Sequence, residues 1–211
     1  LEHHRMFIRN MKMLKLQSLT AVQYLNQRKA SEDSVSALME NLTSGLITVM
    51  EIVGENAIEK LKHLVGPDSY DEAKTNQPLS FRALYGFDDT RNAVMISDNS
   101  MMNQQDLEFF FPLRCNDNNL KVTAKLSKST LCLIKPHAVK EGLIGEIIKQ
   151  IVANGFSITA MKMINLTRAQ CETFYEVYKG VVDDFMSMVL QLQSGACLAM
   201  EIQSSDDDVQ L

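Results

Sequence analysis

The sequence repeats itself at one constant offset, and this repeat limits the folds open to the chain. The segments MKMLKL (11–16) and SGLITVMEI (44–52) return 150 positions later as MKMINL and SGACLAMEI. Across the 42 aligned positions 11–52 no gap is needed, and 12 positions are identical. A period of 150 residues is far longer than a solenoid repeat and has the size of a whole domain. The sequence therefore predicts a tandem duplication.

The two copies differ in the part of the repeat that each contains. Residues 131–152 have no counterpart in the first copy, and residues 54–112 have none in the second. We expect the C-terminal portion of a first domain in residues 1–112, a polar linker in 113–129, and the N-terminal portion of a second domain in 130–211. Each portion is expected to pair its own strands, because local pairing costs less chain entropy. The alternative is a composite sheet in which residues 131–134 join the first copy.

Composition and charge exclude several classes of protein. A chain of 211 residues with 45% hydrophobic residues can bury a sizeable core. The net charge of -5 argues against a general nucleic-acid binder, which needs a basic face. No stretch approaches the ~18–20 apolar residues of a membrane span, so no membrane partner is expected. The four cysteines lie far apart without metal-ligand spacing, which favours reduced thiols in the cytoplasm and no metal site.

Hydrophobic patterns give the order of elements in one complete copy. Apolar or alternating runs predict strands at 131–134, 156–163, 197–202 and 93–96. Stripes at helical spacing predict helices at 143–152, 167–178, 183–192 and 57–65. A long loop is expected past Pro67 and Pro78. Without the inserted helices the order is β-α-β-β-α-β, so the expected class is α+β, with helices on an antiparallel ferredoxin-like sheet.

Three motifs resemble those of nucleoside diphosphate kinases. IKPHAVKEGLIGEII (134–148) resembles the family's opening I-K-P-D-[GA] followed by G-L-[IV]-G-x-I-[IL]. SGACLAMEI resembles its S-G-P-x-x-A-M strand, and FRALYGFDDTRNAVMISDNS (81–100) resembles the segment that ends in R-N-x-x-H-G-S-D-S. Together these matches cover nearly the whole chain outside the linker. The resemblance implies two incomplete tandem copies of the ferredoxin-like nucleoside diphosphate kinase fold.

The resemblance also implies roles for particular residues. Members of this family pass a γ-phosphate from one nucleotide to a histidine and then to a second nucleotide, with Mg²⁺ and nucleotide bound. Lys135 matches the lysine that reaches the transferred phosphoryl group, and Tyr175 matches the tyrosine that supports it. Lys62 and Arg82 match residues that hold phosphates, and Asn92 matches an asparagine that meets the ribose.

The nucleophile of the family is replaced in the first copy. The pair Arg91-Asn92 fixes the register, and the position of the histidine is occupied by Met95. A thioether is neither basic nor anionic and cannot carry a transferable phosphate. In the second copy the histidine would lie beyond Leu211. We also expect Asp68, at the position of a threonine, to repel phosphates. The chain is therefore expected to hold no intact catalytic site and no cofactor, and its nucleotide binding is expected to be weakened.

Two classes of function remain open from the sequence. In the first, the chain is a catalytically degenerate tandem that acts as a structural component, because relatives with this arrangement are associated with microtubule-organising complexes and with axonemes. This implies tubulin or other microtubule-associated proteins as partners, and a place on the cytoskeleton of a cilium, flagellum or centrosome. The linker lysines Lys121, Lys125 and Lys128 would then face acidic tubulin. In the second, the chain is a fragment of an active nucleoside diphosphate kinase.

Overall fold

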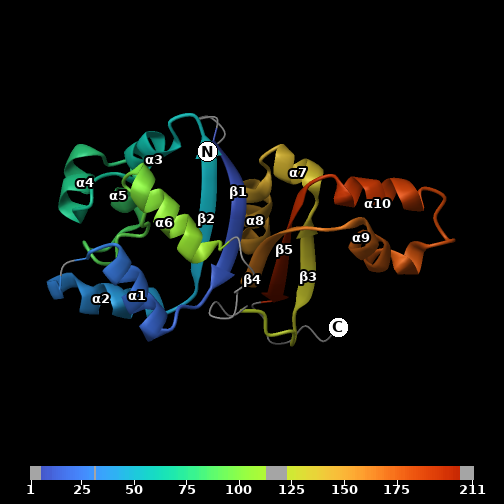
Figure 1. Cartoon of the computed structure of the whole chain (residues 1–211), viewed down its shortest axis with the longest axis horizontal. Helices are drawn as coiled ribbons and strands as arrows, with labels where there is room; N and C mark the ends of the chain where they lie inside the picture. Colours follow the sequence, from blue (N-terminus) through green and yellow to red (C-terminus); the bar gives the residue numbers. More distant parts are fainter. Residues whose placement is uncertain (1–5, 31, 113–122, 205–211) are drawn as a thin grey trace. The chain divides into compact units, whose positions relative to one another are not determined.

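The computed structural model describes residues 6–30, 32–112 and 123–204, and it divides the chain into two compact units (Figure 1). The first unit comprises Leu1–Arg9 and Leu14–Lys121, and the second comprises Asn10–Met13 and Val122–Leu211. The first unit thus contains most of the first copy of the repeat, and the second unit contains the second copy. Each unit is described by itself.

The first unit contains two neighbouring strands with two helices between them in the sequence. Strand β1 (Met6–Leu14) is followed by α1 (Ser18–Gln27) and α2 (Glu32–Thr43), which pack together, and then by β2 (Ile47–Gly54) beside β1. Apolar side chains of α1 and of the chain that enters it form a core with the end of the last helix of the unit. The buried residues of this core are Leu14, Leu16, Ala21, Tyr24 and Phe110.

Four further helices follow β2 in the first unit. These are α3 (Ala57–Val65), α4 (Tyr70–Asn76), α5 (Phe81–Tyr85) and α6 (Ser100–Phe110). The side chain of Ser80 caps α5 by accepting a hydrogen bond from the amide of Ala83 at 3.4 Å. Asn99 caps α6 by accepting one from the amide of Met102 at 2.9 Å. These caps satisfy amides that a helix leaves unpaired at its first turn.

The segment between α3 and α6 differs from the sequence prediction at two points. The long loop expected past Pro67 and Pro78 contains the short helices α4 and α5. The strand predicted at 93–96 is absent, because Ala93 adopts a left-handed φ of 67°, which interrupts an extended backbone. The carbonyl groups of Val94 and Ile96 accept hydrogen bonds from arginine side chains and not from a neighbouring strand.

In the second unit β4, β5 and β3 are neighbours in that order and pair antiparallel, and the stretch Asn10–Met13 of β1 pairs antiparallel with β4, with Lys12 opposite Lys162 (Figure 1). Its strands are β3 (Thr130–Ile134), β4 (Phe156–Asn165) and β5 (Ala196–Ser204). All five residues of β3 pair with β5, from Thr130 opposite Ile202 to Ile134 opposite Leu198. The first strand of the second copy therefore pairs with a strand of its own copy, as the sequence predicted.

Helices of the second unit lie against these strands and against each other. Helices α7 (Pro136–Lys140) and α8 (Ile144–Ala153) contact β5 and β4, respectively. Helix α9 (Arg168–Phe174), the 3₁₀ turn η3 (Glu176–Tyr178) and α10 (Phe185–Gln193) form a helical hairpin between β4 and β5 in the sequence. None of the helices in the described ranges is long and apolar enough to cross a membrane.

The secondary structure repeats with the sequence. When 150 is added to the first residues of β1, α1, α2 and β2, the results fall within three residues of the starts of β4, α9, α10 and β5. The order strand, helix, helix, strand is thus built twice. This correspondence allows equivalent positions of the two copies to be compared directly.

Candidate functional site

The six residues singled out by the family motifs are divided between the two units. The first unit contains Lys62, Arg82, Asn92 and Met95, and the second contains Lys135 and Tyr175. The first group lies on α3, on α5 and on the segment that joins α5 to α6.

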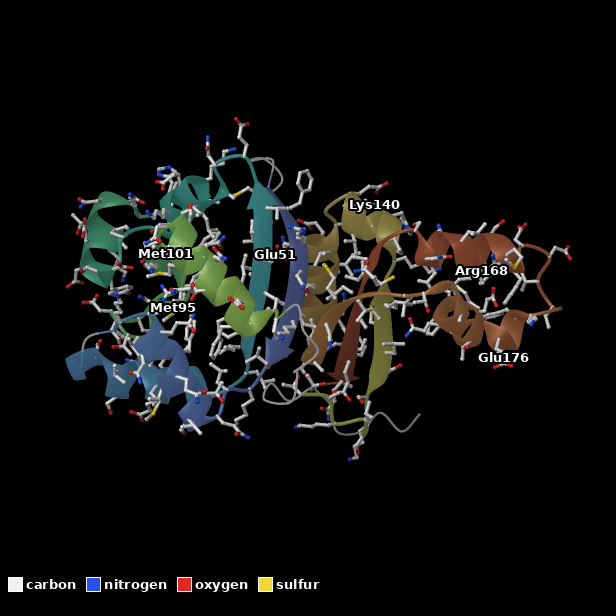
Figure 2. All side chains as sticks on the ribbon, viewed as in Figure 1. Glu51, Met95, Met101, Lys140, Arg168 and Glu176 are labelled. Atoms are coloured by element: carbon white, nitrogen blue, oxygen red, sulfur yellow. The ribbon has the colours of Figure 1, made fainter. Side chains whose placement is uncertain are left out.

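Met95 lies on the segment between α5 and α6 and is 39% exposed. Figure 2 shows it beside the ribbons of α6 and α1. The hydroxyl group of Tyr24, on α1, donates a hydrogen bond to the Sδ atom of Met95 at 3.8 Å. A thioether sulfur is a weak acceptor. The position of the family's histidine is therefore reachable from solvent and is contacted by a phenol.

A buried ion pair fixes the segment that carries Met95. Arg28 Nη1 lies 2.6 Å from Asp106 Oδ2 on α6, and the two side chains are only 12% and 10% exposed. Ser97 donates to the same oxygen at 2.7 Å. Arg28 also donates to the hydroxyl oxygen of Tyr24 at 3.0 Å and to the carbonyl of Ile96 at 2.8 Å. One guanidinium thus holds α1, α6 and the intervening segment together.

The protonation state of Tyr24 follows from its surroundings. Burial raises the pKa of Tyr24 to about 12, and the positive charge of Arg28 only partly opposes this effect. Tyr24 is therefore a neutral phenol at physiological pH and acts as the donor toward Met95. On the other side of the ion pair, the buried Oδ1 atom of Asp106 has no hydrogen-bond partner in the described part of the chain.

The guanidinium group of Arg82 forms hydrogen bonds and an ion pair within its own unit. Its Nη1 atom donates to the carbonyl of Gly66 at 2.9 Å and lies 2.6 Å from Asp68 Oδ1, and its Nε atom donates to the carbonyl of Val94 at 3.4 Å. The guanidinium side chain is only 6% exposed, whereas the Asp68 side chain is 86% exposed. The carboxylate that was expected to repel phosphates therefore also balances the charge of the arginine that was expected to bind them.

Lys62 and Asn92 each contact a residue that is close to them in the sequence. Lys62 Nζ is 3.6 Å from Glu59 Oε1, one helical turn earlier on α3. Asn92 is half-buried, and its carbonyl accepts a hydrogen bond from the amide of Val94 at 2.8 Å. Next to it, Arg91 forms two hydrogen bonds with Asp88 Oδ2, at 2.5 and 2.8 Å, and this contact lowers the pKa of the Asp88 carboxyl.

An open cavity of about 660 Å³ lies between α2, the start of α4 and the segment 88–91. Its walls are tied by a hydrogen bond from the Asn41 amide to the carbonyl of Thr90 at 2.8 Å. Four carboxylates and one guanidinium line it. The charged lining residues are Glu40, Asp71, Asp88, Asp89 and Arg91. Such a surface disfavours a polyphosphate and favours a cation.

In the second unit, Lys135 and Tyr175 have different environments. Lys135 is exposed between β3 and α7, and its carbonyl accepts a hydrogen bond from the amide of Val139 at 3.2 Å. Tyr175 is 5% exposed and lies in an apolar core with Cys171 and Cys197. Burial raises the pKa of both thiols, so they remain protonated at physiological pH. Tyr175 thus packs in the core, while Lys135 is the accessible residue of the two.

Part of the linker is fixed to the second unit. The amides of Lys125 and Leu126 donate to the carboxylate of Glu201 on β5, at 3.0 and 2.6 Å. The hydroxyl groups of Ser129 and Thr159 donate to the same carboxylate at 2.7 and 2.6 Å. These bonds, that of Thr159 above all, lower the pKa of Glu201 to about 2.

The linker lysines that were expected to face a partner are only partly described. Lys125 and Lys128 are exposed on this held segment. Lys121 lies outside the described residues. Two of the three positive charges thus belong to a segment that is anchored by its backbone and by Ser129.

Sequence reasoning did not find Tyr24, Arg28 or Asp106. A signal for them is present in the sequence, because residues four apart on a helix share one face. Asp106 shares a face of α6 with the buried Phe110, and Arg28 follows Tyr24 by four positions. An acid on the apolar face of one helix and a base on the apolar face of another indicate a buried pair.

The nucleoside diphosphate kinase family model matches residues 1–115 and 128–210. The chain is 44% identical over 171 residues to nucleoside diphosphate kinase homolog 7 of Rattus norvegicus, and 43% identical to that of Mus musculus. Each match covers 80% of the chain and 42% of the relative, so the chain spans less than half the length of these curated proteins.

Other matches are more distant. Thioredoxin domain-containing protein 6 of Xenopus laevis is 31% identical over 180 residues, which is 85% of the chain and 26% of that protein. The solved structure of Aquifex aeolicus nucleoside diphosphate kinase matches at a TM-score of 0.48 and 25% identity, over 55% of the chain and 79% of that structure. The family model, by contrast, covers nearly the whole chain in two segments that correspond to the two copies and are interrupted at the linker. The resemblance drawn from the motifs is confirmed: the chain belongs to the nucleoside diphosphate kinase family.

Proposed function

We propose that this chain is a catalytically degenerate member of its family and acts as a structural component of a microtubule-based assembly. Catalytic degeneracy is inferred from Met95, which occupies the position of the nucleophilic histidine. Its sulfur accepts a hydrogen bond from the hydroxyl of Tyr24. Phosphoryl transfer through an enzyme intermediate needs a nucleophile that is basic or anionic in its reactive state. A thioether offers neither property.

Among the described residues that contact Met95 or its segment, no side chain takes over this role. Tyr24 has a pKa of about 12, so its phenolate form is scarce at physiological pH. The carboxylate of Asp106 is buried and paired with Arg28. Loss of one member of a catalytic unit lowers turnover on the order of a million-fold, even where the other members remain.

Charge at the expected nucleotide site supports the same proposal. The carboxylate of Asp68 already pairs with Arg82. An incoming triphosphate would have to displace this carboxylate and would be repelled by its charge. We therefore expect weak nucleotide binding to the first copy, without Mg²⁺ as a resident cofactor.

The structural role rests on the tandem arrangement. It resembles kinase-like pairs associated with microtubule-organising complexes and with axonemes, and related chains include nucleoside diphosphate kinase homolog 7. The exposed Lys125 and Lys128 offer a basic contact for an acidic tubulin surface. The proposed place of action is the cytoskeleton, at an axoneme or a centrosome.

Two measurements test the two parts of this proposal. Incubation with ATP labelled at the γ-phosphate, followed by a search for acid-labile phosphohistidine, should give no label above background. Co-sedimentation with stabilised microtubules should be strong at low salt and should fall when Lys121, Lys125 and Lys128 are changed to glutamate. Pelleting that is absent at low salt, or unchanged in the glutamate variant, would exclude the linker as the contact.

A second candidate function is that of an active kinase fragment. The observation in its favour is the second copy, where Lys135 is exposed at the end of β3 within the IKPHA motif. In that case, phosphate transfer should appear when the second copy is supplied within the full-length protein. Transfer that survives in a full-length variant with Lys135→Ala would argue against this reading.

A further inference from the structure

The helical hairpin α9–η3–α10 of the second unit exposes apolar side chains at its tip. Val177 and Val181 are 77% and 78% exposed, and Val182 and Met186 are about two-fifths exposed. We call these four residues the tip patch. Soluble proteins rarely leave several neighbouring apolar side chains in water unless the surface binds something.

Tight turns of the backbone connect the residues of the tip patch. The amides of Val181 and Val182 both donate to the carbonyl of Tyr178 at 3.1 Å, and the amide of Phe185 donates to the carbonyl of Val182 at 3.3 Å. Gly180, with a φ of 78°, permits the sharp turn between these bonds. The segment between η3 and α10, which carries Val181 and Val182, therefore forms a series of tight turns at one end of the hairpin (Figure 1).

The first copy provides an internal comparison for this surface. The hairpin of α1 and α2 has the same place in the repeat, and its equivalent positions are all polar in sequence. Residues 177, 181, 182 and 186 of the second copy correspond to Gln27, Ser31, Glu32 and Ser36. The four apolar residues are thus a property of the second copy alone.

Three residues of the first hairpin contact a later segment of the first unit. In the first copy, Tyr24, Arg28 and Asn41 contact the segment 90–106. Their equivalents in the second copy are Phe174, Tyr178 and Gln191, none of which belongs to the tip patch. These three contacts of the first hairpin thus have no counterpart in the tip patch.

Charges around the tip patch indicate the chemistry of its partner. Glu176, Asp183 and Asp184 are exposed beside it, against the single base Lys179 (Figure 2 labels Glu176). An apolar centre with an acidic rim complements a segment that carries apolar residues on one face and lysine or arginine at their edges. An acidic segment would meet like charges.

We propose that the tip patch is a docking site for a basic amphipathic helix of another protein. This surface differs from the linker lysines, which suit an acidic partner, and it stands whether or not the chain binds microtubules. Association would bury the four apolar side chains against the apolar face of the helix. The acidic rim would set the orientation and the rate of encounter.

The test uses the full chain and a fluorescent synthetic helix of leucine and lysine as the probe, with fluorescence anisotropy as the readout. The variant Val177→Gln, Val181→Ser, Val182→Gln, Met186→Ser gives the second hairpin the polar character of the first without a change of charge. We expect it to fold, since the positions are exposed, and to bind the probe at least about tenfold more weakly. Neutralisation of Asp183 and Asp184 to asparagine should reduce binding less and should flatten its salt dependence.

Two controls make the result decisive. A leucine–glutamate helix and a scrambled leucine–lysine peptide should bind weakly to the unmodified chain. Equal binding of the probe to the unmodified chain and the polar variant would overturn the proposal, as would absence of binding to both. Sedimentation equilibrium tests whether a second copy of the chain binds the tip patch instead. A dimer of the unmodified chain that dissociates in the polar variant would assign the patch to self-association and would also overturn the proposal.

Discussion

Arg28 and Asp106 are 78 positions apart in the sequence, and their side chains meet in a buried ion pair with a separation of 2.6 Å. The same guanidinium donates to the carbonyl of Ile96, next to Met95. A buried pair of this kind is stable only while both partners are present, because a single buried charge loses its hydration without compensation. The pair therefore determines whether the segment that carries Met95 keeps its conformation.

Replacement of Arg28 by alanine should destabilise the first unit strongly. The change leaves Asp106 buried and unpaired, which is expected to lower the free energy of unfolding by about 3–5 kcal/mol. Urea unfolding followed by circular dichroism measures this loss. The matched control is Arg168→Ala, which removes an exposed pair with Glu172 at 2.8 Å on α9 and should cost about 0.5 kcal/mol or less. Equal losses in the two variants would contradict the role of the buried pair.

Replacement of Gly66 by alanine should also destabilise the first unit. Gly66 has φ 86° and ψ 177°, a region that is essentially restricted to glycine, and an added Cβ would lie 2.5 Å from Ser80 Oγ. We expect a loss of at least about 1–3 kcal/mol in the free energy of unfolding. Gly45→Ala is the control, because nothing lies within 4 Å of a Cβ at that position. A loss in the control equal to that in Gly66→Ala would contradict this explanation.

Much of the fold could be predicted from the sequence because regular elements carry periodic patterns. The isoleucine stripe of 143–152 predicts α8, and the short apolar run 131–134 predicts β3. The failures lie between α3 and α6, where no long period exists. There, a left-handed Ala93 and two arginine side chains that bind backbone carbonyls replace the predicted strand. Such contacts join distant residues and leave no local pattern.

The candidate site could be predicted only where a motif fixes the register. Met95 was found because Arg91-Asn92 fixes its position. The sequence could not show that Tyr24 would reach its sulfur, or that Asp68 would pair with Arg82 at 2.6 Å. The motif could not show that Tyr175 packs in an apolar core, and its supporting role stays a prediction.

Stability of the second unit should depend on pH through Glu201. Its pKa is lowered from 4.5 to about 2 by hydrogen bonds from Thr159 and Ser129 and from the amides of Lys125 and Leu126. A lowered folded-state pKa means that the ionised form stabilises the fold. This contribution is complete above the unfolded pKa and is lost as the pH falls from 4.5 toward 2.

Urea unfolding at a series of pH values through this range measures the effect. Glu201→Gln should lower stability at neutral pH and remove much of the decrease between pH 4.5 and 2. Glu51→Gln, at the equivalent position of the first copy, is the comparison, because Glu51 has one arginine partner, Arg9, at 3.3 Å. A pH profile of Glu201→Gln that parallels that of the unmodified chain would show that the carboxylate does not hold the segment 123–129.

Restoration of histidine at position 95 should not restore phosphoryl transfer. In Met95→His the nucleophile returns, but Arg82 remains paired with Asp68, and the first copy has no counterpart of Lys135. Catalysis of this kind depends on positive charge placed around the transferred phosphoryl group. We therefore expect incubation with γ-labelled ATP to give no more acid-labile phosphohistidine than in the unmodified chain, whose four histidines set the background.

The addition of Asp68→Thr to Met95→His separates the effect of Asp68 from that of Met95. Removal of the carboxylate leaves the charge of Arg82 without its anion, so the double variant should bind ATP more tightly than Met95→His alone, as measured by isothermal titration calorimetry. Stoichiometric labelling of Met95→His by itself would show that neither the Asp68–Arg82 pair nor the missing counterpart of Lys135 prevents transfer to position 95. That outcome would mean that the phosphate-binding residues are still functional.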